Sequence, residues 1–176
     1  VAHFHYTFVP IAIIGFFAGI TFWFPKIFGK MLNETLGKIH FWGTVIPFNF
    51  IFIPLFLLGA AGQHRRIYNF QNFQDLASPE FYNLRVIATI SLVIMIAFQL
   101  VFVINMIISL RSKEKAPKNP YNSNTLEWTA ESPPPHGNWP VLPTVYRGPY
   151  EYSHPDRESD FWPQDEPGPD PTDSDY

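Results

Sequence analysis

The sequence has 176 residues and a net charge of −3, and it contains no cysteine, which excludes disulfides, thiolate metal sites and cysteine nucleophiles. It is 47% hydrophobic, but this average conceals two different parts. Of the 18 prolines, 13 lie from Pro117 onward, whereas the apolar residues crowd into the first 110 positions.

Three apolar stretches are long enough to cross a bilayer, which takes about 20 residues. They cover about residues 1–24, 39–61 and 84–110, and none has a lysine, aspartate or glutamate in its interior. Because none shows the polar face that a soluble helix bundle needs, we predict an all-α transmembrane fold over residues 1–111. Residues 112–176 predict an extended, polar, Pro-rich tail, and their composition from residue 156 onward is typical of disorder.

Lysines and arginines in the short loops orient the three spans. Seven of these cations lie in the first loop and in the segment after the third span, and three lie in the middle loop. The seven are Lys26, Lys30, Lys38, Arg111, Lys113, Lys115 and Lys118, and the three are Arg65, Arg66 and Arg85. We therefore expect the first loop and the tail on the cytoplasmic or matrix side, and the N-terminus and middle loop on the outer side.

Two histidines, His3 and His5, lie at the start of the first span. A spacing of two is about 200° on an α-helix, so the rings point to nearly opposite faces and cannot share one metal ion. A single histidine there would more often be neutral and hydrogen-bonded to a neighbouring helix. Two of them, flanking Phe4, favour metal ligation, and imidazole is a common axial ligand of haem iron. The pattern predicts one haem iron on each flank.

Arg65 and Arg66 follow the second span on the outer side, at the same expected depth as the histidines. An arginine pair at a helix end is ordinarily an interfacial anchor. Arginine also binds carboxylates through two parallel hydrogen bonds, and haem carries propionates. We therefore predict that Arg65 and Arg66 pair with the propionates of the two haems.

The other polar residues of the spans predict structural roles. We expect His40 to be an interfacial polar cap, and Asn49, Gln99 and Asn105 to form hydrogen bonds between helices. The sequence has no Ser/His/Asp set, no phosphate loop and no basic patch for nucleic acid.

Several short motifs follow one another along the chain. They are Val1-Ala2-His3-Phe4-His5-Tyr6, Trp23-Phe24-Pro25, Leu32-Asn33-Glu34-Thr35, Lys38-Ile39-His40-Phe41, Asn49, Phe52-Ile53-Pro54, Leu57-Leu58-Gly59-Ala60-Ala61-Gly62, Arg65-Arg66, Thr125-Leu126-Glu127-Trp128 and Ser132-Pro133-Pro134-Pro135. Taken together and in this order, these motifs resemble subunit I of the haem-copper terminal oxidases, of the cytochrome c oxidase aa3 type. The resemblance extends to about Tyr152. A departure lies after the arginines, where Ile67-Tyr68-Asn69-Phe70 replaces an aromatic-acidic-aromatic-proline run of many relatives.

The resemblance implies the last three helices of a twelve-helix bundle and two haems, expected to be haem A. It implies that His3 is the axial ligand of the high-spin haem, that His5 is one axial ligand of the low-spin haem, and that Phe4 lies between them. Arg65 and Arg66 would hold the propionates. Copper B, magnesium and the second low-spin ligand belong to parts of the subunit outside this sequence, so the chain would be inactive alone.

The implied function is proton-pumping reduction of oxygen to water with electrons from cytochrome c, in a complex with the remainder of subunit I, subunits II and III and membrane lipid. A quinol oxidase shares these motifs and stays open. Two further alternatives are a non-catalytic membrane interaction protein and a small dihaem electron carrier. We expect a bacterial cytoplasmic membrane rather than a mitochondrial inner membrane. Because Val1 opens inside an apolar run, we expect a separately encoded or cleaved C-terminal part.

Overall fold

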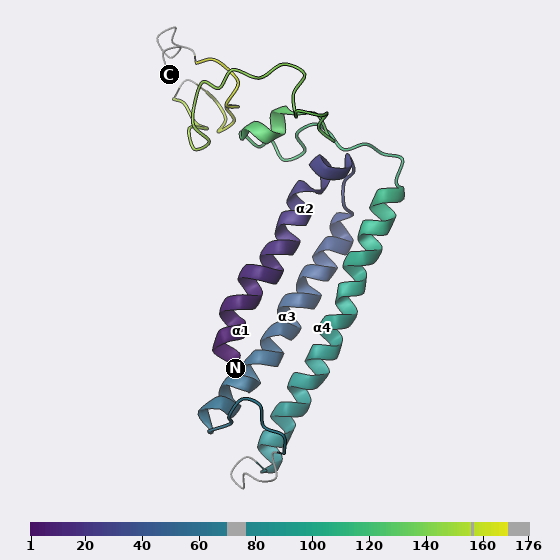
Figure 1. Ribbon diagram of the computed structural model, residues 1–176, viewed down its shortest axis with the longest axis vertical. Helices are drawn as coiled ribbons and strands as arrows, with labels where there is room; N and C mark the ends of the chain where they lie inside the picture. Colours follow the sequence, from purple (N-terminus) through teal and green to yellow (C-terminus); the bar gives the residue numbers. More distant parts are fainter. Residues whose placement is uncertain (70–76, 156, 169–176) are drawn as a thin grey trace. The chain divides into compact units, whose positions relative to one another are not determined.

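The computed structural model describes residues 1–69, 77–155 and 157–168, and in these ranges the regular structure is entirely helical (Figure 1). Residues 70–76 of the middle loop lie outside the described residues. So do residue 156 and residues 169–176, which belong to the part of the tail for which disorder was expected. The elements are α1 (Ala2–Val9), η1 (Pro10–Ile14), α2 (Gly15–Phe28), α3 (Glu34–Ala60), α4 (Pro79–Arg111) and η4 (Leu126–Thr129).

Three continuous helical segments are long and apolar enough to cross a membrane: Ala2–Phe28, Glu34–Ala60 and Pro79–Arg111. They correspond to the three expected spans and confirm the all-α transmembrane fold. Their outward side chains are largely apolar and exposed, as in Phe8, Ile53 and Leu100. A helix suits a segment that spans lipid, because it satisfies every backbone N–H and C=O group within the segment itself.

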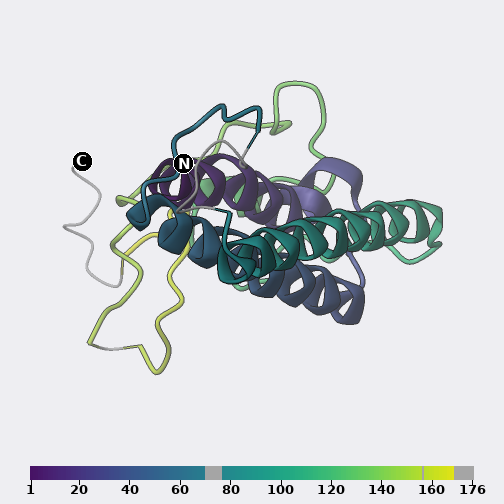
Figure 2. The ribbon, with the colours of Figure 1, turned by 90° about the horizontal axis from the view of Figure 1, so that it is seen from below.

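The chain forms two compact units. The first contains Val1–Thr21 and Leu32–Ser109 and holds most of the three helices, which run side by side (Figures 1 and 2). The second contains Phe22–Met31 and Leu110–Tyr176.

The first spanning segment is not a uniform α-helix. Residues Pro10–Ile14 form a π-helical turn between α1 and α2, and the Gly15 N–H reaches the carbonyl of Pro10, five residues back. Proline has no N–H to donate, so the regular α-helical bonding pattern is interrupted at this point. The turn follows directly on α1, which carries both histidines.

Three polar layers tie α3 to its neighbours in the first unit. Near the start of α1, the Tyr6 hydroxyl donates to Asn49 Oδ1 at 2.8 Å. Nearer the N-terminus of α3, the Gln99 side chain bonds His40 Nε2 at 3.0 Å and Thr44 Oγ1 at 3.1 Å. At the N-terminus of α3, the Asn105 amide accepts from Asn33 N and donates to Asn33 O, at 2.9 and 3.0 Å.

These layers confirm the expected interhelical hydrogen bonds of Asn49 and Gln99, whereas Asn105 of α4 bonds Asn33, the residue that caps α3. The expectation for His40 was wrong. Its ring is buried, bonded to Gln99 of α4 and packed against Phe17 and Phe102 at 4.8 and 5.0 Å between ring centroids. Burial of an imidazole favours a hydrogen-bonded partner over contact with the interface.

The second unit is organised around one buried lysine. The Lys26 ammonium donates to the carbonyls of Ala130 at 2.6 Å and Lys118 at 3.2 Å, and it lies 5.1 Å from the centroid of the buried Trp128 ring. Three carbonyls in reach, counting Glu131 at 3.5 Å, replace the water that this charge loses on burial.

Farther along the tail, Trp162 is 5% exposed, with the guanidinium groups of Arg147 and Arg157 stacked near its ring at 3.6 and 4.8 Å. The buried Gln164 accepts from Leu126 N and donates to Arg147 O. Residues 157–168 are thus held by specific packing that their polar composition did not indicate.

Candidate functional site

Helix α1 (Ala2–Val9) carries both candidate ligands, His3 and His5, in a single helical turn. Because α1 is helical here, the opposed directions expected from their spacing apply. The His5 side chain is half-buried, whereas His3 and the intervening Phe4 are exposed. The two flanks of α1 therefore differ in how much of the described chain surrounds each imidazole.

The His5 ring is held by a hydrogen bond to the backbone. Its Nδ1 lies 2.9 Å from the carbonyl oxygen of Val1. A carbonyl oxygen only accepts, so Nδ1 must carry the proton and donate it. In a neutral imidazole the proton is then absent from Nε2, whose lone pair is left for a metal. The contact selects the tautomer that an Nε2 ligand requires.

Two aromatic rings surround the same imidazole. Phe52 of α3 is stacked on His5 at 4.9 Å between centroids with an interplanar angle of 14°, and Phe4 meets it edge-on at 5.3 Å and 88°. Neither contact was foreseen from the sequence. The pairing of Phe52 with His5 depends on the register between α1 and α3, for which no local pattern gives a signal.

The donor groups of the candidate site are two single imidazoles, His3 and His5. No group of three or more His, Cys, Asp or Glu side chains that could hold a metal is found among the described residues. A metal held only by this part of the chain would have one imidazole. A haem would need only single imidazoles of this kind from the protein, because the cofactor itself would supply the remaining nitrogen donors to its iron.

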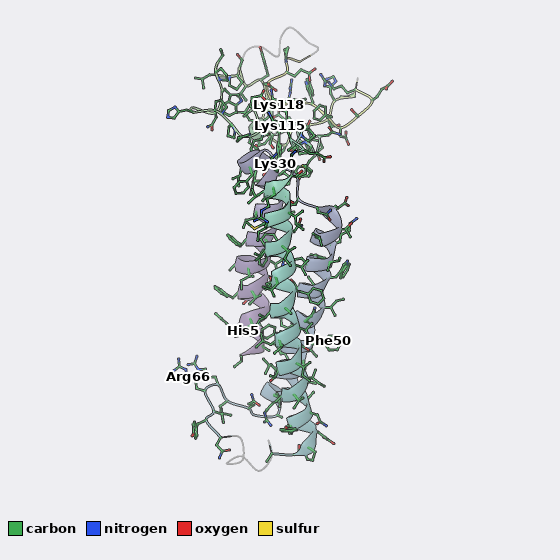
Figure 3. All side chains as sticks on the ribbon, turned by 90° about the vertical axis from the view of Figure 1, so that its right-hand side faces the viewer. His5, Lys30, Phe50, Arg66, Lys115 and Lys118 are labelled. Atoms are coloured by element: carbon green, nitrogen blue, oxygen red, sulfur yellow. The ribbon has the colours of Figure 1, made fainter. Side chains whose placement is uncertain are left out.

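Arg65 and Arg66 lie in a turn shortly after α3 ends at Ala60. Both side chains are exposed, and Arg66 adopts a positive φ of 63°, which is uncommon for a residue other than glycine. Figure 3 shows Arg66 and His5 toward the same end of the helical unit. The two arginines thus lie beyond the end of helix α3, and their exposed guanidinium groups are accessible to a carboxylate ligand. They lie toward the same end of the unit as His5.

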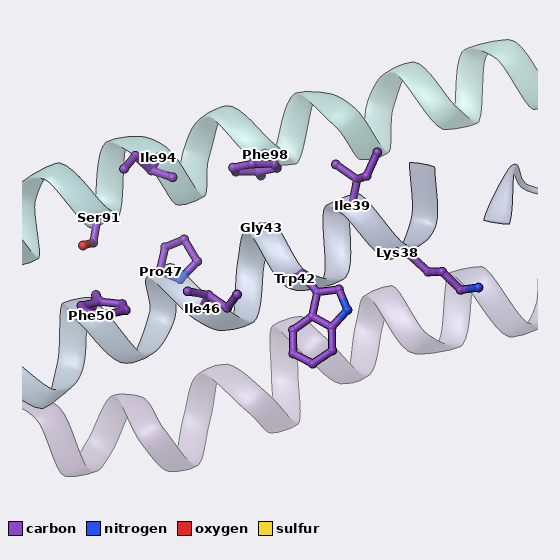
Figure 4. Close-up of a pocket in the computed structure, with 10 residues that line it drawn as sticks. All are labelled: Lys38, Ile39, Trp42, Gly43, Ile46, Pro47, Phe50, Ser91, Ile94 and Phe98. Atoms are coloured by element: carbon purple, nitrogen blue, oxygen red, sulfur yellow. The ribbon is translucent and has the colours of Figure 1, made fainter. Parts of the chain in front are cut away.

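A separate groove between α3 and α4 contrasts with the histidine site (Figure 4). It has a volume of about 670 Å³ and is lined by apolar side chains such as Ile46 and Phe98, with Lys38 at its end. It contains no imidazole or carboxylate. It therefore lacks the donor atoms that a metal or haem iron requires.

An all-helical chain with three helices long and apolar enough to cross a membrane defines the class of multi-spanning helical membrane proteins. The comparisons with known proteins narrow this class. Residues 1–94 match the family "Cytochrome C and Quinol oxidase polypeptide I". The chain belongs to this family, which includes the catalytic subunit I of haem-copper oxidases.

Three relatives show the range of the similarity. The chain is 40% identical to the alternative cytochrome c oxidase subunit 1 of Bradyrhizobium diazoefficiens over 171 residues, which are 96% of this chain and 29% of that protein. It is 42% identical to cytochrome c oxidase subunit 1 of Thermostichus vulcanus over 153 residues, 86% of the chain and 26% of the relative.

The third relative is cytochrome bo(3) ubiquinol oxidase subunit 1 of Buchnera aphidicola, 42% identical over 151 residues, 82% of the chain and 22% of the relative. The chain spans less than a third of the length of these curated relatives. The chain is thus about as similar to a ubiquinol oxidase subunit 1 as it is to the two cytochrome c oxidase subunits.

Proposed function

We propose that this chain is the C-terminal portion of the catalytic subunit of a proton-pumping haem-copper oxidase, in which His5 ligates the low-spin haem and His3 the high-spin haem. The observation that carries the proposal is the backbone bond from His5 Nδ1 to the Val1 carbonyl, which leaves Nε2 as a ligand in a chain of this family. Bound haem, expected to be haem A, would supply reversible one-electron chemistry and oxygen binding.

The chain's own residues would bind and orient the two haems. The exposed ring of Phe4 lies between the two histidines in sequence and would fill the space between the haems. The Arg65 and Arg66 guanidinium groups would neutralise the propionates through charge-assisted hydrogen bonds. Their placement outside helix α3, at the His5 end of the unit, supports this role.

The rest of the machinery would come from elsewhere. Copper B, magnesium and the second axial ligand of the low-spin haem need donor atoms beyond those described here, so the chain would act with the remainder of subunit I in a twelve-helix bundle. Subunits II and III and membrane lipid complete the proposed assembly. The bacterial relatives support a bacterial cytoplasmic membrane over a mitochondrial inner membrane.

Cytochrome c is the electron donor we propose, because two of the three relatives described above are named cytochrome c oxidases. The similarity to a ubiquinol oxidase subunit makes quinol the second candidate. Oxygen uptake by the purified complex separates the two donors. We expect uptake with reduced cytochrome c and none with ubiquinol alone, and the reverse result would identify a quinol oxidase.

Replacement of each histidine in the purified complex tests the ligand assignment. His5→Ala should remove the low-spin haem signals from optical and electron paramagnetic resonance spectra, since the iron loses an axial ligand. His3→Ala should alter the high-spin signals and leave the low-spin ones. His136→Ala, at an exposed tail position, is the matched control and should leave both unchanged.

An unchanged low-spin spectrum in His5→Ala would contradict the ligand assignment and would favour a non-catalytic membrane interaction protein. Spectra of the chain purified by itself address the other alternative. Two stoichiometric haems bound to the isolated chain would identify a self-sufficient dihaem carrier and would contradict the shared-subunit proposal.

A further inference from the structure

We propose that Phe52 is a positioning residue for the low-spin haem, because it fixes the plane of the His5 ring while the Val1 carbonyl fixes its tautomer. This inference rests on the proposed function, in which His5 is the low-spin ligand. It concerns a side chain of α3 that would not itself touch the iron.

The two constraints act on different degrees of freedom of the imidazole. The 2.9 Å bond from Nδ1 to the Val1 carbonyl sets which nitrogen carries the proton and which edge of the ring faces the helix. The Phe52 ring, 4.9 Å away and within 14° of parallel, blocks rotation of the imidazole about its Cβ–Cγ bond. Together they define one orientation for the Nε2 lone pair.

Phe52 can impose this orientation because its own ring is immobilised. It is 8% exposed and belongs to a core cluster with Ala2, Phe48 and Ile51. The Phe48 ring lies 4.8 Å away, and the Tyr6 ring packs at 6.1 Å. A side chain in a closely packed core keeps its rotamer, so the flat face that Phe52 turns to His5 is a fixed surface.

The Tyr6 hydroxyl secures the same register from the adjacent position on α1. Its 2.8 Å bond to Asn49 Oδ1 joins α1 to α3 one turn away from Phe52. Asn49 is itself held, because its amide donates to the Val45 carbonyl at 2.9 Å. The stacking of Phe52 on His5 is therefore backed by a hydrogen bond that resists sliding of one helix along the other.

The described residues give no equivalent support to His3. Its side chain is exposed, and within residues 1–69, 77–155 and 157–168 no hydrogen bond or ring contact of its imidazole is found. Within the described residues, His5 is thus oriented by specific contacts and His3 is not. A change at Phe52 should act on the low-spin haem alone.

The test compares two phenylalanines of α3 in the purified complex. Phe52→Leu removes the flat face against His5. Phe50→Leu is the matched control, since Phe50 is 57% exposed and lines the groove between α3 and α4. Outer partners of metal-ligating histidines typically matter 10- to 100-fold for binding, so we expect roughly 10-fold faster low-spin haem loss in Phe52→Leu.

Electron paramagnetic resonance supplies a readout that is independent of activity. In Phe52→Leu the low-spin g values should shift and broaden, because the imidazole samples several orientations, while the high-spin signals stay unchanged. Phe50→Leu should match the unmodified complex. Phe52→Tyr, which keeps the ring, should restore the unmodified low-spin spectrum.

Two results would overturn the inference while leaving His5 as a ligand. One is a Phe52→Leu complex whose g values and haem retention equal those of Phe50→Leu. The other is equal perturbation of both haems, which would mark Phe52 as a general packing residue. If Phe52→Leu does not assemble, Phe52→Met is judged by the same two criteria, because its flexible, unbranched side chain can fill an irregular core gap without presenting a flat face. Failure of the proposed function has its own signature, an unchanged low-spin spectrum in His5→Ala.

Discussion

Asn105 is a buried and hydrogen-bonded polar side chain of α4 in the first unit. It is 1% exposed, and its amide forms two hydrogen bonds with the backbone of Asn33, while its Oδ1 also accepts from Ser109 Oγ at 3.3 Å. Asn33 in turn caps α3, since its side chain accepts from Leu36 N at 3.0 Å. Asn105 of α4 therefore holds the residue that begins α3.

We expect Asn105→Ala to destabilise the helical unit by about 1–3 kcal/mol, because it removes two partly buried hydrogen bonds to the backbone of Asn33, each worth about 0.5–1.5 kcal/mol. The thermal midpoint of unfolding of the complex in detergent measures the effect. Ser109→Ala is the control, since it removes one bond to an oxygen that keeps another donor. Equal midpoints for the two variants would contradict the role of Asn105 in holding Asn33.

At the residue scale, the sequence predicted the parts of the site that depend on spacing along one helix. The opposed directions of His3 and His5 follow from a period of 3.6 residues, and α1 is helical as required. Phe52 could not be predicted in the same way, because its contact with His5 joins residues 47 positions apart through the packing of α1 on α3. The hydrogen bond from His5 to the Val1 carbonyl could not be predicted either, because every residue of a helix has a backbone carbonyl and the sequence does not show which of them a side chain contacts.

Helices α3 and α4 approach each other closely at Gly43. A Cβ atom added there would overlap the ring of Phe98. The missing side chain lets α4 seat an aromatic ring directly on the backbone of α3, as small residues do between membrane helices. Gly37, on the same helix, has nothing within 4 Å of its added Cβ position.

Gly43→Ala should therefore destabilise the first unit by roughly 1–3 kcal/mol through overpacking. Gly37→Ala should be neutral or slightly stabilising, because alanine is the better helix former. Thermal unfolding in detergent measures both, and adding Phe98→Ala to Gly43→Ala should recover part of the loss. A Gly43→Ala variant as stable as Gly37→Ala would show that Phe98 moves aside without cost.

At the element scale, hydropathy located the three spans. A long apolar segment in a bilayer must be helical or part of a closed barrel, because lipid offers its backbone no hydrogen-bond partners. The boundaries moved where local chemistry decides them. Helix α3 starts at Glu34 instead of about residue 39, since Asn33 provides a cap, and α4 extends back to Pro79, whose fixed φ suits a first helical position. The π-helical turn at Pro10–Ile14 has no hydropathy signal.

At the scale of whole units, the second unit has an acid-sensitive contact. Arg157 holds Glu166 through two bonds, Nη2–Oε1 at 2.7 Å and Nη1–Oε2 at 3.3 Å, and it also lies near the Trp162 ring. The hydrogen bond from Arg157 lowers the pKa of Glu166, and the charges of Arg157 and Arg147 act in the same direction.

A lowered pKa in the folded state means that Glu166 stabilises this part of the tail above the ordinary glutamate pKa of about 4.3. That stability should be lost as the pH falls through the lower folded value. The pair is partly exposed, so the loss should not exceed about 1 kcal/mol. Hydrogen exchange of residues 157–168, compared at each pH with Glu166→Gln, measures it, and identical pH profiles would contradict the prediction.

The Lys26 ammonium sets an order of events during synthesis. Its three carbonyl partners lie 92 to 105 residues farther along the chain, at Lys118, Ala130 and Glu131. In a nascent chain that has not yet reached these residues, the Lys26 ammonium can be solvated only by water. These three hydrogen bonds form only after residue 131 has been synthesised, so a product truncated before Lys118 would leave the Lys26 ammonium without its carbonyl partners.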